Sequence, residues 1–266
     1  MSSSVIEISD LVGLTSAKRI VEAVRDRESG VHAILFYGQR GSGKTTLARS
    51  LAASWLCKES DGGVACGSCG VCTSFANDRS VDFLTIKPTG ASAIIVRGAF
   101  VQDKNKPDHS VIPLTEYFRS RPLMAATKVA HIRDAHRLNQ DATNAFLQTL
   151  EEPPDHARMI LTTHEFSRVP ATIRSRCLCV ACELPTDDRI TSAIGELSSV
   201  ESVFGATPGG VMLLRKTPEP YQKLFNLLES LAERPKGAAL LVGEELRSIS
   251  SELADQTDLN LSLIHI

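Results

Sequence analysis

An eight-residue glycine-rich segment constrains the fold of this chain more than any other feature. Residues 38–45 read GQRGSGKT and match the phosphate-loop pattern G-x-x-x-x-G-K-[ST] at every fixed position. The apolar run before it, 34–37, predicts a buried strand, and the spacing of apolar residues over 45–56 predicts a helix after it. A phosphate loop requires this context of strand, loop and helix, which argues against a chance glycine-rich turn.

This segment carries the groups that bind nucleotide phosphates. Its glycines allow backbone N–H groups to surround the phosphate oxygens, and the N-terminus of the following helix favours an anion. Lys44 supplies a cation for the outer phosphates, and Thr45 can coordinate Mg²⁺. We therefore predict that ATP with Mg²⁺ contacts Gly38, Gly41, Gly43, Lys44, Thr45 and Thr46.

Apolar runs alternate with helical patterns along the first two thirds of the chain, which predicts an α/β fold with a parallel sheet covered on both faces. After Pro185 the pattern is helical, so a small helical second domain is expected there. The expected segments are strands at 34–37, 83–86, 128–132, 159–163 and 178–181, helices at 11–27, 45–56 and 140–152, irregular structure at 57–72 and a solvated loop at 98–109.

The composition is that of an ordinary globular protein, with 23% charged residues and a net charge of −2 over 266 residues. This charge gives no bulk attraction to nucleic acid or membranes, and Arg119, Arg121 and Lys128 are too few to define a DNA-binding surface. No apolar run reaches the roughly 18 residues that a membrane span needs, and the N-terminus has no secretory pattern. A cytoplasmic protein without a membrane partner is expected.

Four cysteines are grouped directly after the predicted helix, at positions 57, 66, 69 and 72. Four thiolates at this spacing can close a tetrahedral Zn²⁺ site with no open position, which makes the expected site structural. An iron–sulfur cluster and unligated thiols are the alternatives, and the former usually has a further close cysteine. Three more cysteines are expected to be small buried side chains: Cys177, Cys179 and Cys182.

ATP hydrolysis needs an acidic residue at the end of a second strand to organise Mg²⁺. The strand predicted at 128–132 is followed by Arg133 and Asp134, and an arginine at that place repels the metal. Asp134 can still contribute to the nucleotide site, or Asp134 and His136 can cap the helix that follows. We therefore predict nucleotide binding without efficient turnover.

Several motifs together resemble the bacterial clamp-loader ATPases of the replicative DNA polymerase, which are AAA+ proteins. They occur in the family's order and span about residues 11–181. The carrying segments are Val31-His32-Ala33, the phosphate loop, the four cysteines, NAFLQTLEEPP at 144–154 and SRC at 175–177. The resemblance implies an AAA+ phosphate-loop domain with a zinc-knuckle insertion, followed by a small helical lid.

Within that family the chain is most similar to the delta-prime subunit. Arg133-Asp134 replaces an acidic pair, and Gly210 of the ATPGG segment stands where active members carry an arginine that senses the γ-phosphate. The segments 112–118 and 121–123 also resemble the delta-prime pattern. The intact phosphate loop is a mild argument for the motor subunit. Weak or absent ATPase activity is expected.

The resemblance assigns roles to individual residues. Arg176 is expected to reach the ATP of a neighbouring motor subunit as an arginine finger, the alternative being an ordinary surface arginine. Thr162 or Thr163 matches the sensor position near the γ-phosphate, the alternative being a core-facing strand threonine. The Glu151-Glu152 pair is expected to be a solvated helix end.

The resemblance also implies a domain plan and partners. The expected boundaries are 1–183 for the nucleotide domain with its cysteine module at 57–72, 184–240 for the lid, and 241–266 for the start of a truncated collar with a non-native tail. Expected partners are the gamma/tau motor and delta subunits, and, through the complex, the sliding clamp and primed DNA. The competing functions are the ATP-hydrolysing gamma/tau motor itself and a small phosphate-loop kinase.

Overall fold

A computed structural model of the chain describes residues 13–90, 92–102, 112–184, 195, 197–204, 207–216, 218–230 and 244–249. The chain divides into two compact units, Met1–Thr186 and Asp187–Ile266. Within the described residues, no helix is both long and apolar enough to cross a membrane.

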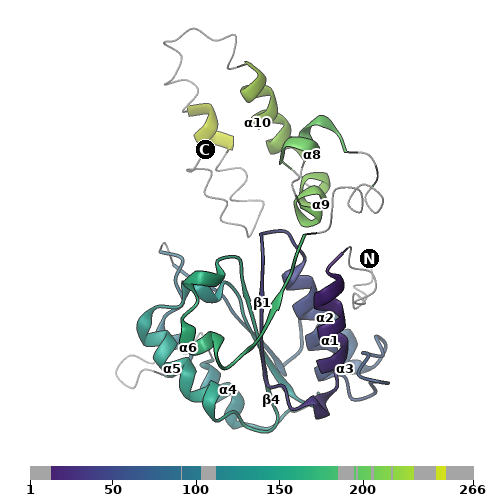
Figure 1. Cartoon of the computed structure of the whole chain (residues 1–266), viewed down its shortest axis with the longest axis vertical. Helices are drawn as coiled ribbons and strands as arrows, with labels where there is room; N and C mark the ends of the chain where they lie inside the picture. Colours follow the sequence, from purple (N-terminus) through teal and green to yellow (C-terminus); the bar gives the residue numbers. More distant parts are fainter. Residues whose placement is uncertain are drawn as a thin grey trace. The chain divides into compact units, whose positions relative to one another are not determined.

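The first unit is built on one five-stranded sheet, drawn at the centre of its ribbon in Figure 1. The strand order is β2-β3-β4-β1-β5, and each strand runs parallel to its neighbours. The predicted α/β fold with a parallel sheet is therefore confirmed. The strands are β1 (Ala33–Tyr37), β2 (Phe83–Ile86), β3 (Lys128–Ile132), β4 (Ala157–Thr163) and β5 (Leu178–Ala181).

Helices cover both faces of this sheet, as its apolar strands require (Figure 1). Successive β1 residues alternate between the two cores: Ile34 and Phe36 lie in one, Leu35 in the other. One core takes residues from α1 (Thr15–Val24), α2 (Lys44–Leu56) and α3 (Gly70–Ala76), and the other from α4 (Leu114–Arg119), α5 (Gln140–Glu151) and α6 (Ala171–Arg174).

Strand register brings the carboxyl ends of neighbouring strands together. Tyr37, the last residue of β1, pairs with Thr163 of β4 on one side and Ala181 of β5 on the other. The phosphate loop after β1 therefore lies beside the residues that follow β4 and β5. Ligands of parallel α/β sheets bind at this edge.

Two predicted segments differ from the structure. The cysteine insertion is not wholly irregular, because α3 begins inside it and Asp61 bridges Val64 in antiparallel fashion. The segment predicted as a solvated loop contains the short 3₁₀ helix η3 (Arg97–Ala99) and the fully buried Phe100, which packs 5.0 Å from Phe146. An aromatic side chain at the start of this segment was the missed signal; residues 103–109 of it lie outside the described residues.

Three further 3₁₀ helices connect elements of this unit: η2 (Arg27–Ser29), η4 (Ala135–Arg137) and η5 (Phe166–Arg168). The N-terminus of α5 is capped by Asn139, whose side chain accepts a hydrogen bond from the Ala142 N–H at 2.8 Å. The helix ends at Glu151, two residues before Pro153-Pro154, which cannot continue it.

The described part of the second unit is helical. It comprises α8 (Ser199–Phe204), α9 (Pro208–Lys216), α10 (Pro218–Ser230) and a short helix at residues 244–249. Arg215 of α9 pairs with Glu201 of α8 at 2.6 Å. Gly210, which the resemblance relates to a lost arginine, lies in the first turn of α9. A small core holds this unit together: Leu214, Tyr221, Leu224, Leu227 and Ile249. The lid and collar remain predictions, and of the segment expected as collar and tail, residues 241–243 and 250–266 lie outside the described residues.

Candidate functional site

The phosphate loop connects the end of β1 to the first residue of α2, Lys44. Gly41 and Gly43 have left-handed backbone angles, with φ of 74° and 88°. At Gly38 a Cβ atom would collide with the carbonyl oxygen of Cys182, which follows β5. Backbone angle at two positions and close packing at the third therefore require glycine, as a loop that wraps phosphates needs.

Lys44 is buried within this loop. Its Nζ donates hydrogen bonds to the carbonyl oxygens of Gly38, at 2.8 Å, and Gln39, and lies 3.3 Å from Ser42 Oγ. Burial lowers the pKa of the ammonium, and the nearby Cys182 and Asp134 oppose that shift. A phosphate would replace these contacts to neutral carbonyl oxygens with hydrogen bonds between two charged groups, which are stronger. Thr45 is exposed and Thr46 half-buried in the first turn of α2.

Asp134 lies near Lys44 of the phosphate loop, and its charge raises the pKa of that ammonium. Its part in nucleotide binding stays a prediction. It has a left-handed φ of 51° and makes no side-chain capping bond to η4, so it does not act as the helix cap. Its Oδ1 is 3.2 Å from His164 Nδ1, and a hydrogen bond from His164 lowers its pKa. Arg40 of the loop approaches the same imidazole, with its NH2 group 3.0 Å from His164 Nε2.

A second group of contacts extends this cluster along the ends of β3 and β4. His136 Nδ1 is 2.9 Å from Thr163 Oγ1, which also accepts the Glu165 N–H at 3.1 Å. Glu165 Oε1 lies 3.3 Å from His136 Nε2 and 3.3 Å from His164 Nε2. Burial lowers the pKa of His136 to about 4, so its ring is neutral near pH 7.

The structure separates the two threonines that the sequence left as alternatives. Thr163 contacts His136 in the cluster beside the loop, whereas Thr162 bonds to buried His131 at 3.1 Å. Adjacent residues of a strand point to opposite faces, which explains the difference. Thr163 is therefore the better candidate for a γ-phosphate sensor.

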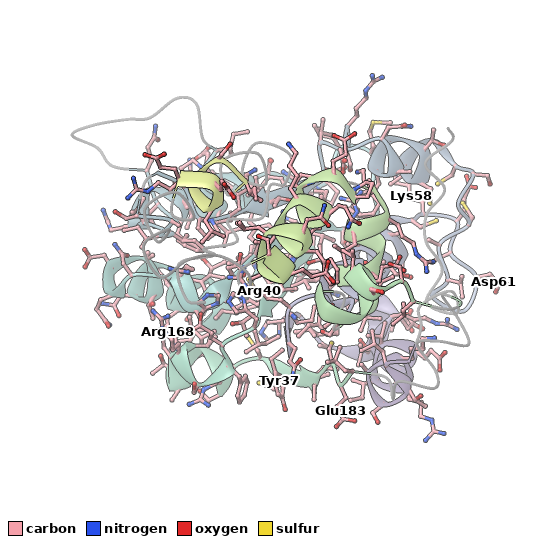
Figure 2. The ribbon with its side chains drawn as sticks, turned by 90° about the horizontal axis from the view of Figure 1, so that it is seen from above. Tyr37, Arg40, Lys58, Asp61, Arg168 and Glu183 are labelled. Carbon is pink, nitrogen blue, oxygen red and sulfur yellow. The ribbon has the colours of Figure 1, made fainter. Side chains whose placement is uncertain are left out.

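Sequence reasoning missed three members of this site, namely Arg40, His164 and Glu165. All three follow the carboxyl end of β1 or β4, and a search for polar residues after predicted parallel strands would have found them. Figure 2 labels Arg40 and also Arg168, whose guanidinium donates to Glu165 Oε2 at 2.8 Å. Metal-ligand atoms of Asp134, His136 and His164 lie within 4.8 Å of one another, but Arg40 brings positive charge to the same place.

Arg176 lies two residues after the end of α6, in the SRC segment at 175–177. Its NH2 group is 2.6 Å from Glu151 Oε1, and its NH1 group donates to the Thr172 carbonyl at 3.0 Å. The arginine side chain is 36% exposed and that of Glu151 is 50% exposed. The prediction that Glu151 and Glu152 form a solvated helix end is confirmed, because both residues are exposed where α5 ends. Glu151 in addition forms the ion pair with Arg176.

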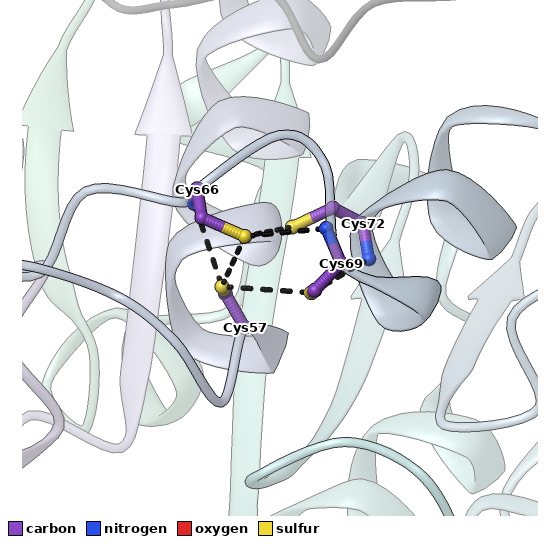
Figure 3. A group of neighbouring side chains, drawn as sticks. All are labelled: Cys57, Cys66, Cys69 and Cys72. Carbon is purple, nitrogen blue, oxygen red and sulfur yellow. Dashed lines mark hydrogen bonds between the residues drawn. The ribbon is translucent and has the colours of Figure 1, made fainter.

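The four clustered cysteines bring their sulfur atoms together (Figure 3). The Sγ–Sγ distances are 3.6 Å for Cys57–Cys66, 3.9 Å for Cys57–Cys69 and 4.0 Å for Cys66–Cys72. A tetrahedral zinc with Zn–S bonds of about 2.3 Å requires sulfur separations of about 3.8 Å. The donor set and its spacing therefore fit Zn²⁺.

Backbone N–H groups point at three of these sulfurs. Cys66 N–H donates to Cys57 Sγ at 3.4 Å, Cys69 N–H to Cys66 Sγ at 3.4 Å, and Cys72 N–H to Cys69 Sγ at 3.5 Å. Donors at these positions stabilise thiolates, and the bond from Cys69 N–H is the main reason that the pKa of Cys66 falls to about 6.

The remaining cysteines are arranged differently. Cys182 is buried, and Cys177 and Cys179 are half-buried against the core that contains α5. Burial raises the pKa of each of these three thiols, which keeps them protonated. The prediction that they fill apolar space holds for Cys182 and in part for the other two.

Comparison with known proteins places this geometry in a family. A family model described as "DNA polymerase III, delta subunit" matches residues 15–185. The gamma/tau subunit of Mycoplasma pneumoniae is 30% identical over 85% of this chain, and the delta' subunit of Pseudomonas aeruginosa is 30% identical over 86%. The Escherichia coli tau subunit is 35% identical over 55% of this chain.

The chain spans 31%, 61% and 21% of these three relatives, respectively. Among solved structures, a gamma-subunit-related protein of Thermotoga maritima is 21% identical with a TM-score of 0.47, covering 94% of this chain and 73% of that one. The RuvB Holliday junction branch migration motor of the same organism is 14% identical with a TM-score of 0.45, covering 91% and 71%. By the match over residues 15–185, the chain belongs to the DNA polymerase III delta subunit family, in agreement with its resemblance to clamp-loader AAA+ subunits.

Proposed function

We propose that this chain is a delta-prime-like subunit of a DNA polymerase III clamp loader in the cytoplasm. It binds nucleotide with little or no turnover and supplies Arg176 to the ATP site of a neighbouring motor subunit. The observation that carries this proposal is Arg133. It directly follows β3, where a hydrolysing site needs a carboxylate for Mg²⁺.

The surroundings of Asp134 support weak turnover. Its carboxylate pairs with His164, and Arg40 adds positive charge beside it. Positive charge where Mg²⁺ has to be held lowers the affinity for the metal. The phosphate loop itself has the lysine and glycines that phosphate binding requires, so the proposal includes binding of a nucleoside triphosphate.

The position of Arg176 supports a role in trans. The side chain is more than a third exposed, and it follows the helix α6 in the SRC segment. A guanidinium that reaches a transferring phosphoryl group stabilises its developing charge, which is worth about 10³–10⁵ in rate in phosphate-loop enzymes. The neighbouring motor and delta subunits, the sliding clamp and primed DNA are the partners that the proposal requires.

The four-cysteine cluster is proposed to hold one structural Zn²⁺ through Cys57, Cys66, Cys69 and Cys72. When bound, the ion supplies a closed tetrahedral crosslink and no open position for chemistry. The cluster joins the end of α2 to the start of α3, so its role is to fix this surface insertion against the nucleotide domain.

The second candidate is the ATP-hydrolysing gamma/tau motor subunit, which the intact phosphate loop and the gamma/tau relatives favour. Equilibrium binding and steady-state turnover of ATP by the isolated full chain separate the two. The proposal predicts binding that Lys44→Ala removes, with turnover no faster than in that variant. Turnover that Lys44→Ala abolishes would favour the motor.

A further inference from the structure

Two motifs that are far apart in the sequence meet at one ion pair. Glu151 is the last residue of α5 and belongs to the LEEPP segment, whereas Arg176 belongs to the SRC segment after α6. Their side chains approach to 2.6 Å, between Glu151 Oε1 and the NH2 group of Arg176. Pro153-Pro154 cannot continue the helix, so α5 ends at Glu151 and this carboxylate lies at its C-terminus.

The guanidinium of Arg176 is held by more than one acceptor. NH1 donates to the Thr172 carbonyl at 3.0 Å and to Ser175 Oγ at 3.4 Å, whereas the contact with Glu151 is made by the other terminal nitrogen, NH2. A planar guanidinium that is hydrogen-bonded at both terminal nitrogens holds the long arginine side chain in one conformation. Thr172 and Ser175 lie within four residues of Arg176 in the sequence, whereas Glu151 connects Arg176 to the end of α5.

We propose that Glu151 is a positioning residue that orients Arg176 toward the neighbouring subunit's phosphate; this inference rests on the proposed function of Arg176. The gain is pre-organisation, because an arginine already held in one conformation loses less freedom when it engages a phosphoryl group. Placement matters at this step, since a displacement of about 1 Å can cost two orders of magnitude in rate.

If the ion pair served only to stabilise the fold, its removal would lower the melting temperature. Both side chains are partly exposed, and exposed pairs contribute little to folding free energy. Removing the carboxylate should therefore leave the melting temperature nearly unchanged. Glu152, the next residue along, offers a matched control because it is exposed and forms no ion pair within the described part of the chain.

The test is a double-mutant cycle in the reconstituted clamp-loading complex, with clamp and primed DNA present. ATP turnover is measured with wild-type chain, Glu151→Gln, Glu152→Gln, Arg176→Ala and Glu151→Gln/Arg176→Ala. We expect Glu151→Gln to lower the part of turnover that depends on Arg176 about tenfold, and Glu152→Gln to leave it unchanged. In the Arg176→Ala background, Glu151→Gln should have no further effect.

The cycle separates failure of this inference from failure of the proposed function. If Arg176→Ala matches the wild type, the trans role of Arg176 is wrong and the inference falls with it. If Arg176→Ala lowers turnover while Glu151→Gln leaves turnover unchanged or raises it, only the positioning role of Glu151 is overturned. An equal loss from Glu151→Gln with and without Arg176 would make its effect independent of Arg176, and this also overturns it.

Discussion

Replacement of Asp82 should destabilise the first unit strongly, because this one small side chain accepts several backbone hydrogen bonds. Asp82 is fully buried just before β2, and its carboxylate accepts three backbone N–H groups. The donors are Leu123 at 2.9 Å, Met124 at 2.7 Å and Ala125 at 2.8 Å. These contacts fix the turn that leads into β3, so the side chain sets the geometry of a segment more than 40 residues away in sequence.

The magnitude follows from what each substitution leaves behind. Asp82→Ala removes the acceptor of all three donors; the residues Leu123 and Met124 are exposed and can be hydrated, but Ala125 is buried. At about 1–2 kcal/mol for each of the three lost bonds, we expect a loss of about 3–6 kcal/mol in the free energy of unfolding. Asp82→Asn keeps one oxygen and should cost about 1–3 kcal/mol.

Chemical denaturation followed by circular dichroism measures these differences directly. Asp78→Asn is the control. Asp78 is largely exposed and its carboxylate forms a surface ion pair with Arg49 at 2.8 Å, so loss of this pair should cost under about 1 kcal/mol. If Asp82→Ala costs no more than Asp78→Asn, the argument that Asp82 organises this turn is wrong.

Three further predictions concern pH, the metal and the loop. Burial depresses the pKa of His136 to about 4, below its usual value of 6.5, so the unfolded chain binds more protons than the folded chain between these pH values. As pH drops from 6.5 to 4, His136 alone should lower the free energy of unfolding by about 3 kcal/mol, and buried His131 adds to the loss. His136→Gln should therefore make this slope shallower in a pH-resolved denaturation series, and an unchanged slope would contradict the argument. The purified chain should contain one equivalent of zinc by elemental analysis, and Cys66→Ser should lose most of it, whereas Cys179→Ser should retain it. Gly38→Ala should abolish nucleotide binding in calorimetry because its Cβ collides with the Cys182 carbonyl; unchanged affinity would refute that packing argument.

The elements that local pattern determines were predicted well. The strands β2, β3 and β5 have the predicted bounds, because short apolar runs between polar segments have few other places to be buried. The ends of β4 and α1 were misjudged by a few residues, since the boundary of an element depends on caps and neighbours. Phe100 was assigned to a solvated loop because its partner, Phe146, is distant in sequence.

The site was predictable only where one segment contains all of it. The phosphate loop and the four cysteines are local motifs, and both are assembled as the spacing implies. Two contacts of the site join distant segments, namely Asp134 with His164 and Glu151 with Arg176. They depend on strand order and helix packing, which cannot be derived from the spacing of residues along the chain. Long-range polar pairs of this kind are therefore findings of the structure.

The most direct test of the account compares two variants of this chain in the same reconstituted complex. Steady-state ATP turnover is measured with clamp and primed DNA for Lys44→Ala, which removes this chain's own loop lysine, and for Arg176→Ala. The account predicts turnover close to wild type for Lys44→Ala and a marked loss for Arg176→Ala. A marked loss with Lys44→Ala and none with Arg176→Ala would identify this chain as a motor subunit and contradict the account.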